Sequence, residues 1–269
     1  MTIARTPEPD IMALESMLEV ATAALVQYQS WSIVLIAVAF AGLELVIPHH
    51  PVNRRRELTK DLVGALAGVV FVTVCYSAIQ WTVRLASRGE LGGAVFELGA
   101  LPSAVRVLMV VLVVDFCIYW LHRLMHHSAC FWRMHRWHHS IEEMYWFAGF
   151  RASLPHILLY GLPQVIVPSL IFDLSAFELA AAAAIGNFVQ VWTHANVKAR
   201  IGPLQWLIVT PDYHRVHHRA SERRAVNLGN VLTVWDRLFG THEAPDSRRS
   251  DRCGLVEPRP PVWRMLLGI

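Results

Sequence analysis

Histidine is the residue type whose spacing could do chemistry in this chain. Nine of its fourteen histidines fall in three short runs, and His194 lies between the second and the third. The runs are HRLMHH (His122, His126 and His127), HRWHH (His135, His138 and His139) and HRVHH (His214, His217 and His218). Imidazole is the commonest metal ligand among side chains. The runs therefore predict a metal site.

The spacing within the runs fits helices, because residues three and four apart share one face. Each H-x-x-H-H set can aim several imidazoles at one point. Three converging sets would supply enough nitrogens for two ions, more than one tetrahedral structural zinc takes. In the first run, His126 shares a face with His122, whereas His127 lies about 100° further round. We favour His126 and hold His127 in reserve, since a distorted helix end would reverse them.

Two other interpretations compete with a metal site. An isolated histidine is more often a hydrogen-bonded structural residue, and we assign four of them to structure: His49, His50, His156 and His242. That interpretation fails for three repeated clusters, because burying so many imidazoles without a metal would leave many polar atoms unpaired. A basic surface patch is the other alternative. The interleaved Met134, Trp137 and Val216 argue against it.

A ligating imidazole needs an acceptor for its second ring nitrogen, commonly a carboxylate or a carbonyl. Asp115 and Tyr119 lie seven and three residues before His122, so both are candidates on that helix. A structural ion pair is the alternative for Asp115. Asp212 is a third candidate and equally a helix cap. We assign Asp236 to structure.

The elements that must position these side chains are apolar helices. The composition is 54% hydrophobic and 17% charged, with a positive mean hydropathy, which indicates lipid as part of the solvent. A helix crosses the hydrocarbon with roughly 20 apolar residues. Five stretches approach that length, at residues 31–47, 62–83, 104–121, 154–172 and 175–192. We expect an all-α integral membrane protein with about four or five transmembrane helices and a cytosolic helical cap carrying the histidine clusters.

Basic residues give the orientation, because cytoplasmic loops are rich in arginine and lysine. They follow the first, third and fifth stretches, on the side of the clusters, although Arg84 and Arg88 lie opposite.

We divide the chain into an amphipathic segment at 1–30, without the pattern of a cleaved signal peptide, and one membrane domain at 31–269. No basic helix or recognition motif indicates a nucleic-acid partner.

The quoted runs also occur in a known order. DFCIYWLHRLMHHSACFWRMHRWHHS, QVWTHAN, TPDYHRVHH and NLGNVLTVWDRLFGT, at about 108–243, resemble the fatty acid hydroxylase (sterol desaturase) superfamily of membrane di-iron oxygenases. Where some members carry another histidine, this chain has Lys198, which leaves a tenth ligand to His127 or His156. The resemblance implies metal ligation by His122, His126, His135, His138, His139, His194, His214, His217 and His218.

The resemblance implies a function as well. It implies two iron ions, with zinc as a possible substitute in purified protein, and the use of O2 to hydroxylate or desaturate a lipid. Electrons would come from a separate ferredoxin or cytochrome with its reductase, since the chain has no dinucleotide fingerprint or cysteine cluster. The setting would be a bacterial inner membrane. A metal-dependent lipid hydrolase or lyase and a histidine-lined metal transporter are the alternative functions.

Overall fold

The computed structural model describes residues 31–87, 100–168, 172, 174–199, 201–220, 225–245 and 252–269, with the main chain alone over 76–87. The predicted amphipathic segment at 1–30 lies outside these residues. The described part is mostly helical, as predicted, and its only β-structure is three isolated bridges. All five apolar stretches form helices there.

The long helices keep the expected order but shift their ends. The first covers Trp31–Val46, followed by α2 (Arg54–Ser87), α3 (Ser103–His127), α5 (Leu154–Ile166) and α6 (Ala176–His194). Because α3 runs on to His127, it carries the whole first histidine run. The helix α6 begins with a capping box, in which Ser175 and Glu178 satisfy each other's main-chain N–H groups.

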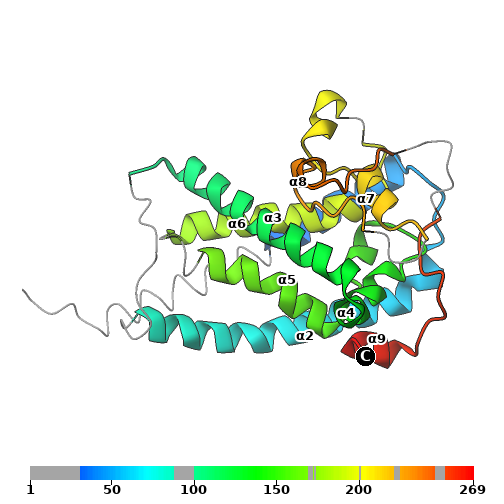
Figure 1. The fold of residues 1–269 in the computed structure, drawn as a ribbon, viewed down its shortest axis with the longest axis horizontal. Coiled ribbons are helices and arrows are strands. Elements are labelled where there is room, and N and C mark those ends of the chain that lie inside the picture. The colour runs from blue at the N-terminus through cyan, green and yellow to red at the C-terminus, as the bar shows by residue number, and fades with distance from the viewer. Residues whose placement is uncertain are drawn as a thin grey trace, which may run out of the picture.

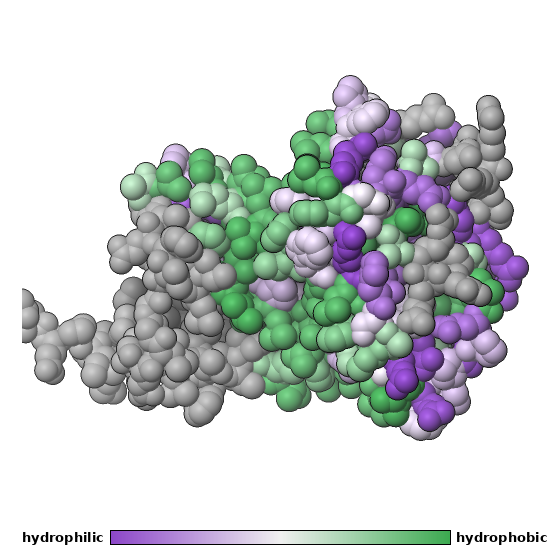
Figure 2. Space-filling model, in the orientation of Figure 1, coloured by the Kyte–Doolittle hydropathy of each residue, from purple (hydrophilic) through white to green (hydrophobic). Residues whose placement is uncertain are grey.

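Two helices of the described part are long and apolar enough to cross a membrane, over Arg54–Cys75 and Ser103–His127. Only 11% of the apolar window in α2 is buried, so this helix is not the core of a soluble protein. The helices at 31–46 and 154–166 are apolar but shorter. Figure 2 shows hydrophobic residues along the body of the molecule and hydrophilic ones gathered at one end. The count of four or five spans stays a prediction.

The shorter elements gather at the hydrophilic end, where the long helices α2, α3, α5 and α6 converge (Figure 1). The helix α4 contacts α3, α5 and α9, and α7 contacts α6. The shorter elements are α4 (Ala129–His139), η1 (Trp146–Phe150), η3 (Gly202–Trp206), α7 (Pro211–His217), α8 (Val234–Leu238) and α9 (Val262–Leu267). Two histidine runs therefore lie on short helices that pack on the ends of longer ones.

A buried ionic cluster joins α2 to the segment that follows α4. The guanidinium of Arg151 donates to Asp61 at 2.7 Å and to Glu57 at 2.6 Å, and the Tyr145 hydroxyl donates to Asp61 at 2.7 Å. All three charged side chains are buried. Removing one partner from such a cluster leaves an uncompensated buried charge, so the cluster fixes this segment firmly. Sequence analysis did not identify it.

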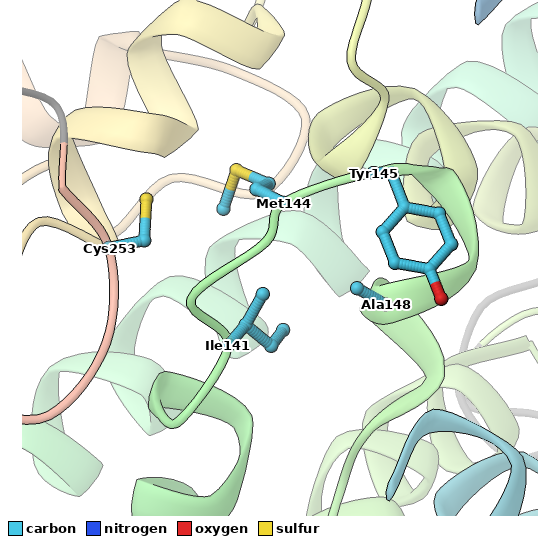
Figure 3. Close-up of a cluster of buried hydrophobic side chains, with 5 residues drawn as sticks. All are labelled: Ile141, Met144, Tyr145, Ala148 and Cys253. Carbon is cyan, nitrogen blue, oxygen red and sulfur yellow. The ribbon is translucent and has the colours of Figure 1, made fainter. Parts of the chain in front are cut away.

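An apolar cluster ties the same segment to the C-terminal part of the chain. Figure 3 shows Ile141, Met144, Tyr145 and Ala148 of this segment together with Cys253. Next to Cys253, the Gly254 N–H donates to the carbonyl of His218 at 3.3 Å. The cluster therefore braces the end of α7 against the segment that follows the second histidine run.

Candidate metal centre

Nine buried histidines converge at the hydrophilic end and form two groups. In each group, one ring nitrogen per residue lies within 4.8 Å of all the others. The first group is His122, His126, His135, His139 and His217, and the second is His138, His194, His214 and His218. These nine are the histidines that the family resemblance implied as ligands.

Two helices, α4 and α7 with its C-terminal cap His218, contribute histidines to both groups. On α4, His135 and His139 enter the first group, while His138, between them on the helix, enters the second. On α7, His217 enters the first group and its neighbour His218 the second. Neither α4 nor α7 could therefore move without disturbing both groups, which places the groups side by side.

The Nε2 atoms point inward and lie close together. His135 Nε2 lies 3.0 Å from Nε2 of both His122 and His139. In the second group, His138 Nε2 lies 3.1 Å from Nε2 of both His194 and His218. When two nitrogens bind the same ion at about 2.1 Å, they are about 3.0 Å apart at an octahedral angle and about 3.4 Å apart at a tetrahedral angle. The observed spacing fits ligands that share an ion.

The Nδ1 atoms of four of these rings lie against main-chain carbonyls. They are His122 with Leu228 O at 2.9 Å, His138 with Arg151 O at 3.1 Å, His194 with Gln190 O at 3.1 Å and His217 with Val226 O at 2.8 Å. A carbonyl only accepts, so Nδ1 carries the hydrogen and Nε2 the lone pair. The surrounding main chain thereby selects the tautomer that presents Nε2 to a metal.

Several ring nitrogens of the groups have no hydrogen-bond partner. They are both nitrogens of His126, Nε2 of His217, and Nδ1 of His214 and His218. Buried polar atoms in native proteins are otherwise almost always paired. Unpaired Nε2 atoms in the first group, together with the close Nε2 pairs in both groups, fit one metal ion in each group.

Burial keeps these imidazoles neutral, which is the form that binds metals. Desolvation lowers the pKa of His217 to about 4. The pKa values of His138, His214 and His218 lie well below the usual value, first through desolvation and then through neighbouring imidazoles. No proton therefore competes for these nitrogens near neutral pH.

Carbonyls, not the expected acids, accept from the Nδ1 atoms of His122, His138, His194 and His217. The carboxylate of Asp115 accepts from Val231 N at 2.8 Å, Leu232 N at 3.0 Å and Trp235 Nε1 at 2.8 Å. The expectation that Asp115 holds an imidazole is therefore replaced by an indirect role, because Val231 and Leu232 lie in the loop that contains Leu228 and Trp235 lies on α8, which follows that loop. A single sequence does not show which distant loop will pack on a helix.

The other two expected acceptors have different partners as well. The Tyr119 hydroxyl lies 2.9 Å from Thr241 Oγ1 and accepts from Arg123 at 3.0 Å. Asp212 pairs with His49 Nδ1 at 3.0 Å. The cap of α7 is Thr210, whose hydroxyl accepts from a main-chain N–H. Tyr119 and Asp212 therefore stabilise the surroundings of the site, and the partners of neither side chain are histidines of the two groups.

Residues 226–229 hold one imidazole from each of two helices. Asn227 has a φ of 53°, a left-handed conformation that asparagine tolerates better than most residues. On either side of it, the carbonyls of Val226 and Leu228 accept from His217 and His122. The turn therefore links α7 to α3 through main-chain oxygens.

Asp236 holds this turn in place. It is fully buried and accepts from Leu228 N at 2.7 Å, Gly229 N at 2.8 Å, Thr241 Oγ1 at 2.6 Å and Tyr213 Oη at 3.0 Å. Its assignment to structure agrees with these contacts. The signal for its importance was the motif WDRLFGT, which lies within the family pattern.

The remaining histidines and Lys198 lie outside both groups. His127 is exposed, and its Nδ1 contacts Arg123 O on its own helix at 2.9 Å. Lys198 is exposed as well. His156 is buried, and its Nδ1 lies 2.9 Å from Nδ1 of His135, on the side of that ring away from the group. Neither reserve histidine brings a tenth nitrogen to the groups.

Comparison with known proteins adds to this geometry. Residues 107–241 match the family model described as fatty acid hydroxylase. This range covers half of the chain, and it contains all nine histidines, the turn at 226–229 and Asp236. It also agrees with the core of about 108–243 expected from the motifs. No solved structure matches the chain.

Curated relatives share about a third of the aligned residues. Alkylglycerol monooxygenase from Homo sapiens is 32% identical over 50% of this chain and 30% of its own length. The ornithine lipid hydroxylase OlsE from Rhizobium tropici is 31% identical over 58% and 47%. Delta(7)-sterol 5(6)-desaturase from Leptosphaeria maculans is 33% identical over 49% and 35%. The chain therefore spans less than half the length of these relatives.

Proposed function

We propose, from the premise that the chain belongs to the fatty acid hydroxylase family, that it is a membrane-bound di-iron oxygenase acting on a lipid. The observation that carries the proposal is the convergence of nine buried imidazoles in two adjoining groups at the hydrophilic end of apolar helices. The reaction would hydroxylate or desaturate an unactivated carbon–hydrogen bond.

The two groups would hold one ion each. His122, His126, His135, His139 and His217 would hold the first, and His138, His194, His214 and His218 the second. Bound iron would supply the reductive activation of dioxygen. All-imidazole groups also suit zinc, so purified protein could carry it instead. The protein's own part is to keep the rings neutral, to fix their tautomers through main-chain carbonyls and to exclude water.

The lipid class is supported by the position of the site. His122 and His135 lie beside the Tyr160 ring of α5, at centroid distances of 5.8 and 6.3 Å. Both α3 and α5 are apolar helices, so a hydrocarbon tail could follow them toward the site without crossing a polar surface. The printed names of the relatives describe an alkylglycerol monooxygenase, a lipid hydroxylase and a sterol desaturase. The shared chemistry is attack on carbon–hydrogen bonds of lipids.

The orientation and the electron donor belong to the same proposal. The basic residues Arg54, Arg55 and Arg56 lie at the start of α2. Next to them, Glu57 pairs with Arg151, which lies in the segment that follows the second histidine run. Basic residues at a helix end favour the cytoplasmic side, so we place the site on the cytoplasmic face of a bacterial inner membrane. Electrons would come from a separate ferredoxin or cytochrome with its reductase.

The test uses the full chain purified in detergent and loaded with iron. It is incubated with a bacterial lipid extract, a chemical reductant and ¹⁸O2, and the lipids are analysed by mass spectrometry. We expect a product that gains one ¹⁸O atom, or one that loses two hydrogens while oxygen is consumed. The His138→Ala variant, which lacks a ligand of the second group, should give neither product.

Each alternative function predicts a different result. Lipid cleavage without oxygen consumption would support the hydrolase or lyase and overturn the oxygenase. Accumulation of metal inside vesicles containing the protein would support a transporter. The nine imidazoles gather in two groups of closely spaced nitrogens, whereas a transport path needs sites that open to both faces of the membrane.

A further inference from the structure

His135 differs from the other ligand candidates in what its second ring nitrogen contacts. The Nδ1 atoms of His122, His138, His194 and His217 each lie against a main-chain carbonyl. Nδ1 of His135 instead lies 2.9 Å from Nδ1 of His156. His135 is also the ring whose Nε2 lies within 3.0 Å of two others in the first group. Its orientation therefore matters for the whole group.

The role of His156 follows from the protons. If His135 gives its Nε2 lone pair to a metal, its hydrogen is on Nδ1. That hydrogen then points at Nδ1 of His156, which must accept it with its own lone pair. The hydrogen of His156 is consequently on Nε2. Metal binding at His135 therefore requires His156 in one neutral tautomer.

Packing holds the His156 ring where it can accept. His156 is at the start of α5, where its N–H donates to the Ser153 hydroxyl at 3.2 Å, and that hydroxyl donates to Met134 O at 2.5 Å. The ring also stacks on Tyr160 at 4.4 Å with an interplanar angle of 22°. Met134 immediately precedes His135, so one hydroxyl fixes both rings relative to each other.

We propose that His156 is a positioning residue for the first metal group and sets the affinity of that group through the hydrogen bond from His135. An imidazole nitrogen is a stronger base than an amide oxygen. It therefore draws the Nδ1 proton of His135 toward itself more strongly, and this makes the Nε2 atom of His135 a better electron-pair donor to a metal. The inference rests on the proposed metal site.

Two substitutions separate this hydrogen bond from simple packing. In His156→Asn, the side-chain oxygen takes the place of Nδ1 and accepts from His135. In His156→Leu, the volume is similar but no acceptor remains. Both are made in a His214→Ala background, which disables the second group, so that the ion of the first group is measured alone. His127→Leu, at an exposed position on α3, is the matched control.

The readouts are Co²⁺ affinity by chelator competition and the absorption bands of the bound Co²⁺. Loss of such an acceptor weakens metal binding about 10- to 100-fold. We expect that loss and shifted bands for His156→Leu, with most of the affinity recovered in His156→Asn. The control should bind like the background protein. If His156→Leu does not fold, His156→Gln replaces it, because its oxygen reaches toward the Nε2 position instead.

The outcomes distinguish this inference from the proposed function. If the background protein binds no Co²⁺ in the first group, the metal site itself is wrong. If it binds Co²⁺ and His156→Leu or His156→Gln leaves the affinity and the bands unchanged, only the role of His156 is overturned. Asparagine as weak as leucine would also overturn it, because packing alone would then explain the effect.

Discussion

The carbonyl oxygen of Leu228 accepts a hydrogen bond from Nδ1 of His122 at 2.9 Å, across 106 positions of the chain. The Leu228 N–H in turn donates to Asp236, which also accepts from Gly229 N. One buried carboxylate therefore fixes a turn, and the turn fixes an imidazole of the first group. Disturbing the carboxylate should affect metal binding from a distance.

Asp236→Asn should reduce both stability and metal content. The amide would direct its two hydrogens at groups that donate now, and unsatisfied buried groups of this kind cost about 2–4 kcal/mol in total. The released turn would no longer orient His122, so we expect the first ion to be lost. Thermal unfolding and metal analysis measure the two effects. Asp212→Ala, which removes a partly exposed pair with His49, is the control and should cost about 0–1 kcal/mol. Equal behaviour of the two variants would contradict the prediction.

Gly149→Ala should disturb the second group alone. A Cβ added at Gly149 would lie 2.7 Å from Cγ and Nδ1 of His194, so the imidazole would have to move at its base. We expect the variant to keep one ion per chain, lose the other, and lose activity. Gly186→Ala, whose Cβ would make an ordinary contact at 3.5 Å with Gln164, is the control on α6. Full metal content in Gly149→Ala would show that the ring position is not critical.

The two groups should bind two ions that can be removed one at a time. We expect two ions per chain in the unaltered protein and one in either His126→Ala or His214→Ala, which belong to different groups. His127→Ala should retain both, because that ring is exposed. Mass spectrometry of the intact protein under native conditions counts the ions. A single ion in the unaltered protein, or loss of an ion from His127→Ala, would contradict this assignment.

The metal-free protein should lose stability as the pH falls below about 6.5. Desolvation lowers the pKa of folded His217 to about 4 and holds that of His214 well below its usual value, whereas an unfolded histidine titrates near 6.5. Below that pH the unfolded chain binds protons that the folded chain does not, so each such histidine removes up to about 1.4 kcal/mol per pH unit. For His217 the loss of stability ends near pH 4, because the folded protein also protonates this residue below that pH.

Unfolding of the metal-free protein in one detergent at pH 7.5, 6.5 and 5.5 checks this dependence. His217→Asn removes one of the titrating groups, so its stability should fall less steeply over the same interval. Stability that does not change from pH 7.5 to 5.5 would show that these imidazoles are not buried in their neutral form.

Local geometry made the helices and the clustering of histidines on them predictable, and the family resemblance implied the full ligand set. The i, i+3, i+4 spacing puts His135, His138 and His139 on one part of a helix in any fold that contains that helix. The spacing also favoured His126 over His127, and the structure turns the first inward and the second outward. The apolar stretches showed where helices would form, because burial or lipid contact requires such runs.

The sequence by itself therefore determined that the clustered histidines lie on helices and that apolar helices carry them. Only the tertiary structure decided that His138 joins His194 rather than its helix neighbours, that carbonyls rather than Asp115 hold the rings, and that His156 receives the proton of His135. The reason is physical. Spacing along a helix fixes only neighbours within about a turn, whereas these contacts join elements far apart in the chain, whose meeting depends on packing.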